Sequence, residues 1–126
     1  MLTFRDLHNW AADGDAVATA VLKSVYESLK PGGVFGVADH RLPAERAQPR
    51  KFNTGYVSVA YVTRLAESVG FKLDAASEIN ANSKDSADHE GGVWALPPTY
   101  VNKGKDHARY AAIGESDRFT LKFVKR

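Results

Sequence analysis

The sequence predicts an α/β fold in which helices alternate with short strands. Two stretches, residues 15–29 and 58–69, carry the apolar spacing of amphipathic helices. Short β-prone runs lie before, between and after them. One of these runs, Val34 to Ala38, is apolar almost without interruption, which is typical of a strand buried on both faces of a parallel sheet. With 126 residues, the chain has room for a single small domain, 1–126.

The first predicted strand is Leu2 to Phe4, and a predicted helix follows from about Asp15 to Leu29. Apolar residues recur at every fourth position from Val17, which forms one stripe along this helix. The triplet Asp13-Gly14-Asp15 supplies turn and N-cap chemistry at its start. Pro31-Gly32-Gly33 ends it, because proline cannot continue a helix and glycine accepts the left-handed turn.

A second helix and strand follow residues 42–56, which are predicted to form a loop or a short irregular helix. Ser58 can cap this helix and Gly70 closes it. In the run from Phe71 to Ile79, the side chains of Phe71, Leu73 and Ala75 alternate with those of Lys72, Asp74 and Ala76. This alternation predicts a strand with one exposed face. Because helical crossovers join the three strands predicted so far, we expect these strands to be parallel.

The remaining third of the chain is predicted to hold a long loop, a short helix and a closing strand. Residues 80–104 are rich in Asn, Asp, Ser, Gly and Pro, and connections of that length tend to be functional or disordered. Residues 106–113 predict a short helix. Phe119, Leu121 and Phe123 occupy alternate positions of the closing strand, whose direction the periodicity leaves open.

Composition and charge exclude several classes of function. The 17 basic and 15 acidic residues are scattered, and the densest basic stretch, Arg46 to Lys51, is smaller than a nucleic-acid-binding face requires. The absence of cysteine excludes disulfides, thiolate nucleophiles and cysteine-ligated zinc. No run approaches the ~18 apolar residues of a membrane span, and the start does not have the pattern of a signal peptide. We therefore expect no nucleic-acid or membrane partner and a cytoplasmic location.

The segment Leu29-Lys30-Pro31-Gly32-Gly33, followed directly by Val34 to Ala38, resembles the junction between a helix and the fifth strand of class I S-adenosylmethionine-dependent methyltransferases. The later order also matches, with a helix, the Gly70-Phe71 step into the sixth strand, and a last strand. The resemblance covers nearly the whole chain and corresponds to the C-terminal half of that fold. It implies a partial Rossmann-like sheet with helices on its faces, mostly parallel, with an antiparallel last strand between the fifth and the sixth.

The segment Leu7-His8-Asn9-Trp10 resembles the Leu-His-Asp-Trp segment that follows the fourth strand of small-molecule O-methyltransferases. In those enzymes the histidine is the general base toward the substrate hydroxyl, so the resemblance implies that His8 is catalytic. An imidazole suits this role because its ordinary pKa of about 6.5 lets it accept a proton near neutrality. Asn9 replaces the aspartate of the motif, and we expect the carboxylate that could tune the imidazole to be missing.

The resemblance implies S-adenosylmethionine as cofactor, with Arg5, Asp6 and Leu7 against the cofactor and Trp10 against a small-molecule substrate. The family binds this cofactor with a glycine-rich turn after its first strand, and this sequence has no such motif. Three interpretations stay open. The chain is a fragment of a larger methyltransferase, or a module that pairs with itself or a complementing chain to cover its exposed first strand, or a free-standing relative that binds or transforms another ligand.

Other polar residues are candidates for substrate contact. Asp39, His40 and Arg41 follow a predicted parallel strand, and open α/β sheets place ligands at that end, although a polar strand terminus can also simply cap the next loop. Trp94 lies in the long loop, where it could cover a substrate or anchor the loop. The histidines lack the paired spacing of metal ligands, so no metal site is predicted.

Overall fold

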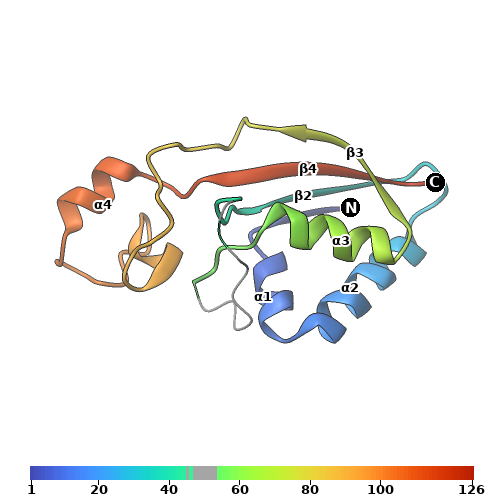
Figure 1. Ribbon diagram of the computed structural model, residues 1–126, viewed down its shortest axis with the longest axis horizontal. Helices are drawn as coiled ribbons and strands as arrows, with labels where there is room; N and C mark the ends of the chain where they lie inside the picture. Colours follow the sequence, from blue (N-terminus) through green and yellow to red (C-terminus); the bar gives the residue numbers. More distant parts are fainter. Residues whose placement is uncertain (45, 47–53) are drawn as a thin grey trace.

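The computed structural model describes residues 1–44, 46 and 54–126. Within these residues, four strands form one sheet: β1 (Leu2–Phe4), β2 (Val34–His40), β3 (Phe71–Ser77) and β4 (Arg118–Lys125). The helices are α1 (Leu7–Ala12), α2 (Asp15–Ser28), α3 (Val59–Ser68), the 3₁₀ helix η1 (Gly92–Ala95) and α4 (His107–Ile113). Figure 1 shows α1, α2 and α3 together on one face of the sheet, whereas α4 lies beyond its end. The predicted α/β class is confirmed.

The strands lie in the order β1-β2-β4-β3. β1 pairs with β2 in parallel, and β4 is antiparallel to both of its neighbours, β2 and β3. β3 therefore has the same direction as β2 without touching it, as expected for three strands joined by helical crossovers. The last strand lies between the two strands where the resemblance placed it.

The main core lies between the sheet and the helices α1, α2 and α3. Its centre is aromatic: the rings of Phe35 and Phe71 are stacked with centroids 5.4 Å apart, and Tyr26 meets Phe71 edge-on at 5.1 Å. Aromatic pairs at such separations contribute roughly 0.5–1.5 kcal/mol each beyond the area they bury. This cluster fixes α2 against the sheet.

The buried stripe of α2 is rotated away from the predicted one. Ala18, Leu22 and Val25 are buried, whereas Val17 is 41% exposed. A repeat of four residues drifts around a helix that has 3.6 residues per turn. The apolar repeat that starts at Val17 therefore begins on the solvent side and enters the core only at Val25.

The ends of the helices follow the predicted chemistry in part. Ser58 caps α3, because its hydroxyl accepts a hydrogen bond from the backbone N–H of Tyr61 at 3.0 Å. The N-cap of α2 is Gly14, without a side-chain cap bond. Asp15 instead binds the Tyr61 hydroxyl at 2.6 Å and so joins α2 to α3.

The prediction of a half-buried strand from Phe71 onward is wrong for most of its length. Phe71 is buried, but Leu73 is 40% exposed and every later residue of β3 is exposed as well. Within the part of the chain that the structure describes, β3 pairs only with β4, and the register shifts between Leu73 and Ala75. A bulge of this kind in an edge strand turns the following side chains away from their regular positions.

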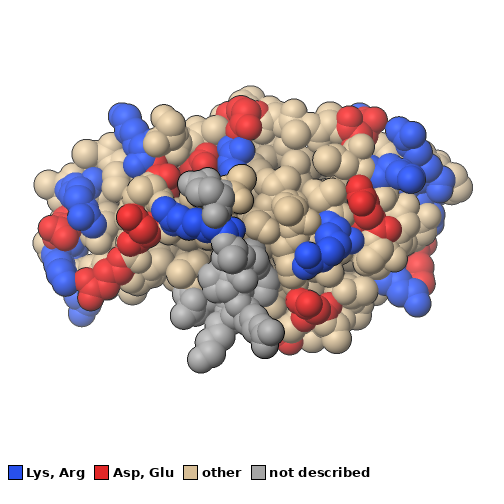
Figure 2. Space-filling model, in the orientation of Figure 1, with Lys and Arg blue, Asp and Glu red and all other residues tan. Residues whose placement is uncertain are grey.

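The first strand is an exposed edge, as expected from the sequence. Among the described strands, β1 pairs only with β2, and its side chains Leu2 and Phe4 are 66% and 61% exposed. Figure 2 shows the charged side chains of one face interspersed in sign. Most of the predicted loop at 42–56, including Arg50 and Lys51 of the basic stretch, lies outside the described residues. Among the described helices, none has the length and hydropathy needed to span a membrane.

We expect the substitution Gly70→Ala to destabilise the protein by about 1–3 kcal/mol, because Gly70 has a φ of 114° that other residues adopt only under strain. An added Cβ would also lie 2.8 Å from the ring of Tyr26. Gly104→Ala is the matched control, since a Cβ there meets nothing within 4 Å. Urea unfolding of both variants checks the prediction, and equal midpoints for the two would contradict it.

Candidate functional site

A cavity of about 350 Å³ opens where the carboxyl ends of β1 and β2 meet the start of β4. Its walls come from the β1–α1 turn, from the end of β2, from the residues just before and at the start of β4, and from the 92–99 part of the long loop. Open α/β sheets place their ligands at this end of their parallel strands. The residues on the cavity are Phe4, Arg5, Asp6, His8, Asn9, His40, Val93, Trp94, Leu96, Pro97, Pro98, Thr99, Ser116 and Arg118.

His8 reaches the cavity from the first turn of α1. This helix was not predicted, since it has only six residues and its buried face consists of Leu7, His8 and Ala11. Asp39 fixes the imidazole: Nδ1 of His8 lies 2.8 Å from Oδ1 of Asp39, and the backbone N–H of His8 donates to Oδ2 at 2.9 Å. Both side chains are buried, His8 at 6% exposure and Asp39 at 0%.

The parallel register of β1 and β2 brings this pair together. Phe4 lies opposite Ala38, and the backbone N–H of Arg5 donates to the Ala38 carbonyl at 2.7 Å. The chain then turns at Arg5, whose φ is 57°, and α1 starts directly over Asp39. The expectation that His8 lacks a carboxylate partner is wrong, because β2 supplies the carboxylate that Asn9 does not.

His40 is the second imidazole of the cavity. Its ring centroid is 5.2 Å from that of His8, and its Nδ1 lies 2.5 Å from the hydroxyl oxygen of Ser116. Burial lowers the pKa of His40 to about 4; the charge of Asp39 acts against this shift, while His8, Arg118 and Arg5 add to it. His40 is therefore neutral at physiological pH.

Trp94 belongs to the wall of the cavity that the long loop supplies. Its indole meets the imidazole of His8 edge-on, with ring centroids 6.2 Å apart, and the side chain remains 37% exposed. The 3₁₀ helix η1 carries it, and the backbone N–H of Val101 donates to its carbonyl at 2.8 Å. The long loop thus covers one side of the cavity.

The structure separates the predicted site residues into two groups. Arg5, Asp6, His8, His40 and Trp94 line the cavity, whereas Leu7, Trp10, Asp39 and Arg41 do not. Leu7 is buried in the main core and Trp10 packs against it. Arg41 turns to the other side, where its guanidinium binds Glu78 and Asp117, and Asp39 lies beneath His8.

Ser116 and Arg118 also line the cavity, and the sequence reasoning missed them. They come just before and at the start of β4, which is antiparallel to β2 and so begins where β2 ends. The polar run before an apolar strand was visible in the sequence. Whether this run lies near the end of β2 depends on the direction of the closing strand, which the periodicity does not reveal.

His8, Asp39 and His40 could each offer one ligand atom to a metal ion, with these atoms within 4.8 Å of one another. The sequence spacing did not predict this group. In the structure the Asp39 oxygens accept N–H groups from His8 and His40, and both Nδ1 atoms have protein partners. The Nε2 atoms are the ring nitrogens left for the cavity.

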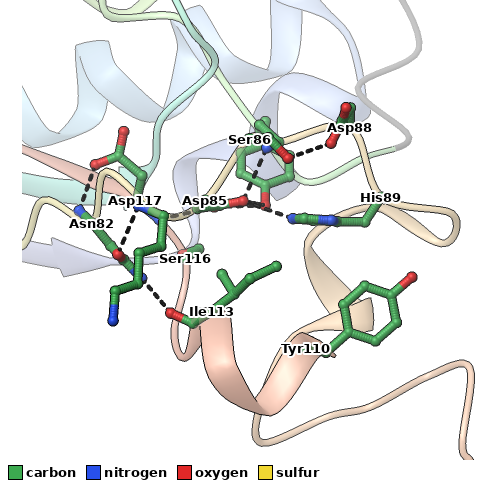
Figure 3. Close-up of polar contacts among 12 residues, drawn as sticks. Asn82, Asp85, Ser86, Asp88, His89, Tyr110, Ile113, Ser116 and Asp117 are labelled. Carbon is green, nitrogen blue, oxygen red and sulfur yellow. Dashed lines mark hydrogen bonds and ion pairs between the residues drawn. The ribbon is translucent and has the colours of Figure 1, made fainter. Parts of the chain in front are cut away.

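The long loop is held in place by the carboxylate of Asp85 (Figure 3). This buried group accepts hydrogen bonds from the Tyr56 hydroxyl at 2.8 Å, from Nε2 of His89 at 2.7 Å, and from the backbone N–H groups of Ala87 and Asp117, each at 2.9 Å. Burial and the neighbouring Asp85 charge raise the pKa of Tyr56, which keeps its hydroxyl protonated. Asp85 therefore ties the loop to the start of β4.

We expect His40 to make the stability of the protein depend on pH. The pKa of His40 in the folded state, about 4, lies below its ordinary value of 6.5. The contribution of neutral His40 to the free energy of unfolding is therefore complete above pH 6.5 and is lost as the pH falls toward 4. The loss amounts to about 3 kcal/mol at pH 4. Urea unfolding between pH 7 and pH 4 measures it, with His40→Gln as the control that lacks this titration. Equal pH slopes for the two proteins would contradict the prediction.

No known family model matches the chain, and no curated protein is significantly similar to it in sequence. Two solved structures are similar in fold. One is the [4+2]-cyclase SpnF, with a TM-score of 0.52, 13% sequence identity, and coverage of 98% of this chain and 49% of the cyclase. The other, from Listeria monocytogenes, is described as an S-adenosylmethionine-dependent methyltransferase, with a TM-score of 0.47, 17% identity, and coverage of 99% of this chain and 60% of that one. This chain therefore shares its fold with part of the cyclase chain and spans about half of the cyclase's length.

Proposed function

We propose that this chain forms the acceptor side of an S-adenosylmethionine-dependent methyltransferase that methylates a hydroxyl group of a small molecule, with His8 as the general base. The observation that carries the proposal is the buried His8–Asp39 pair at the edge of the cavity. The sequence resemblance to small-molecule O-methyltransferases and the fold shared with a larger enzyme support it.

The pair suits proton transfer because an ionised carboxylate only accepts hydrogen bonds. Asp39 therefore holds the proton of His8 on Nδ1, which leaves Nε2 as the accepting nitrogen of a residue that lines the cavity. That nitrogen accepts the proton of the substrate hydroxyl as its oxygen becomes nucleophilic. The imidazolium that results is stabilised by the carboxylate at 2.8 Å.

The described residues fit one side of a cofactor site. Arg5 and Asp6 lie on the cavity with opposite charges, which match the carboxylate and the ammonium of an amino-acid moiety. Leu7 is buried in the core and has no place in such a site. The chemistry that S-adenosylmethionine supplies when bound is an electrophilic methyl group. Within this chain, Arg5 and Asp6 would bind and orient the amino-acid moiety of the cofactor, and His8 would take the proton of the substrate hydroxyl.

A second candidate function is a reaction of a bound small molecule without methyl transfer. The observation that favours it is the fold likeness to a cyclase, which covers 98% of this chain. The same cavity and the same His8–Asp39 pair would then move a proton on a different ligand. Binding of the cofactor separates the two candidates.

Calorimetric titration with S-adenosylmethionine and S-adenosylhomocysteine tests the proposal. We expect heat with both ligands, and loss of that heat in the variant Asp6→Ala, whereas Asp13→Ala, an exposed aspartate outside the cavity, should leave it unchanged. Transfer of a radiolabelled methyl group to a panel of phenols and alcohols then identifies the acceptor class. Absence of heat, together with an unchanged melting temperature, would favour the second candidate.

A further inference from the structure

The cavity contains a second histidine that the proposed function does not use. His40 is 8% exposed, lines the cavity, and lies with its ring centroid 5.2 Å from that of His8. Its Nδ1 is bound to Ser116, so Nε2 is the nitrogen that remains for the cavity. What this nitrogen can do depends on which ring nitrogen carries the proton.

Arg118 and Ser116 determine the position of that proton. The guanidinium of Arg118 has only donors, and its Nε donates to the Ser116 hydroxyl oxygen at 3.2 Å. The hydroxyl proton is then free to point at Nδ1 of His40, 2.5 Å away. Because Arg118 already occupies one lone pair of the serine oxygen, this arrangement favours Nδ1 as the acceptor. A neutral imidazole with an accepting Nδ1 carries its proton on Nε2.

His40 stays neutral in this environment. Its side chain is buried, and the positive groups Arg5 and Arg118 also line the cavity, both of which disfavour an imidazolium. The lowered pKa of His40 agrees with this. The two imidazoles are therefore opposite in character: Asp39 leaves His8 with an accepting Nε2, and Ser116 leaves His40 with a donating Nε2–H.

We propose that His40 is a second catalytic residue of the cavity, which donates the hydrogen bond of its Nε2–H to the substrate oxygen while His8 accepts the proton of that oxygen. The proposal rests on the proposed function and deepens it. The O–H bond breaks, its proton passes to Nε2 of His8, and one electron pair of the oxygen forms the bond to the methyl group. The bond from that methyl group to the cofactor sulfur breaks, and its electron pair stays on the sulfur.

This arrangement selects the class of acceptor atom. A hydroxyl oxygen has two lone pairs, so it can attack the methyl group with one and accept from His40 with the other. A neutral amine has a single lone pair and cannot do both. Donors aimed at a developing oxyanion act most strongly where the charge forms. We therefore assign hydroxyl acceptors, and phenols or enols above alcohols, to this cavity.

The position of the two protons can be measured without substrate. In protein labelled with ¹⁵N-histidine, long-range ¹H–¹⁵N correlation spectra at pH 7.5 distinguish a protonated ring nitrogen from an unprotonated one. We expect His40 with the proton on Nε2 and His8 with the proton on Nδ1. The variants His8→Gln and His40→Gln assign the signals. Protonation of His40 on Nδ1, or on both nitrogens, would overturn the proposal, whatever the outcome of the cofactor titration.

Methyl transfer to a phenol provides the second test. We expect His40→Leu to lower kcat about 10²–10³-fold, as for the loss of one oxyanion donor, with KM nearly unchanged. His40→Gln restores a donor amide and should recover part of that loss. Ser116→Ala should shift the His40 nitrogen signals toward a mixture of tautomers, whereas the exposed Ser83→Ala should not. Equal rates for the Leu and Gln variants, or unchanged signals in Ser116→Ala, would contradict the role of His40.

Discussion

The substitution His8→Gln is expected to lower the rate of methyl transfer by about 10²–10⁴-fold, because the general base is removed and the amide cannot accept a proton at neutral pH. The effect should fall on kcat, since the proposed function assigns the cofactor to Arg5 and Asp6 rather than to the imidazole. Rates with a radiolabelled methyl donor at saturating acceptor measure it.

The fold and the cofactor affinity must be followed in the same variant, because His8 is buried and bound to Asp39. The melting temperature and the titration with S-adenosylhomocysteine serve this purpose. His107→Gln is the matched control, since His107 is an exposed histidine at the start of α4. A rate within threefold of the wild type in His8→Gln, with the fold intact, would refute the assignment of the base.

The largest loss of stability is expected from Asp85→Ala, about 3–5 kcal/mol in the free energy of unfolding. The substitution removes the carboxylate that accepts hydrogen bonds from four donors: the Tyr56 hydroxyl, Nε2 of His89 and two backbone N–H groups. A buried donor without an acceptor costs about 1–3 kcal/mol, and these four share one carboxylate. Chemical denaturation with intrinsic fluorescence as the signal gives the free energy.

Asp88→Ala is the matched control for Asp85→Ala, because Asp88 is an exposed aspartate of the same loop that contacts Ser86. We expect its free energy of unfolding to stay within about 0.5 kcal/mol of the wild type, as for most surface substitutions. Hydrogen exchange should show faster exchange at Ala87 and Asp117 in the Asp85 variant. A change in Asp85→Ala no larger than in Asp88→Ala would show that the network carries no stability.

Local chemistry predicted most of the secondary structure. The Pro31-Gly32-Gly33 stop, the Ser58 cap and the alternation of Phe119, Leu121 and Phe123 act within a few residues, and the structure has a helix end, a helix start and a strand at these places. The six residues of α1 are too few for a periodic signal. The exposed side chains of β3 belong to an edge strand with a register shift, and both features depend on the partner strand.

The site was harder to predict because its pairs join distant parts of the chain. His8 and Asp39 are separated by 31 positions, and only the register of β1 against β2 aligns them. The resemblance places the carboxylate next to the histidine, at Asn9, whereas in the structure it comes from Asp39 on β2. Ser116 and His40 are 76 positions apart and meet through an antiparallel pairing that no periodicity reveals.

The position of β4 determines when the sheet can form during synthesis. This strand, the last of the four in the sequence, lies between β2 and β3, and Lys125 at its end binds the carbonyls of Tyr26 and Leu29 at the end of α2. Before residues 118–125 leave the ribosome, β2 and β3 have no partner on their facing edges. Pairings that span so much of the chain form slowly and leave strand edges open in the meantime. The nascent chain is therefore most exposed to aggregation in the interval before β4 emerges.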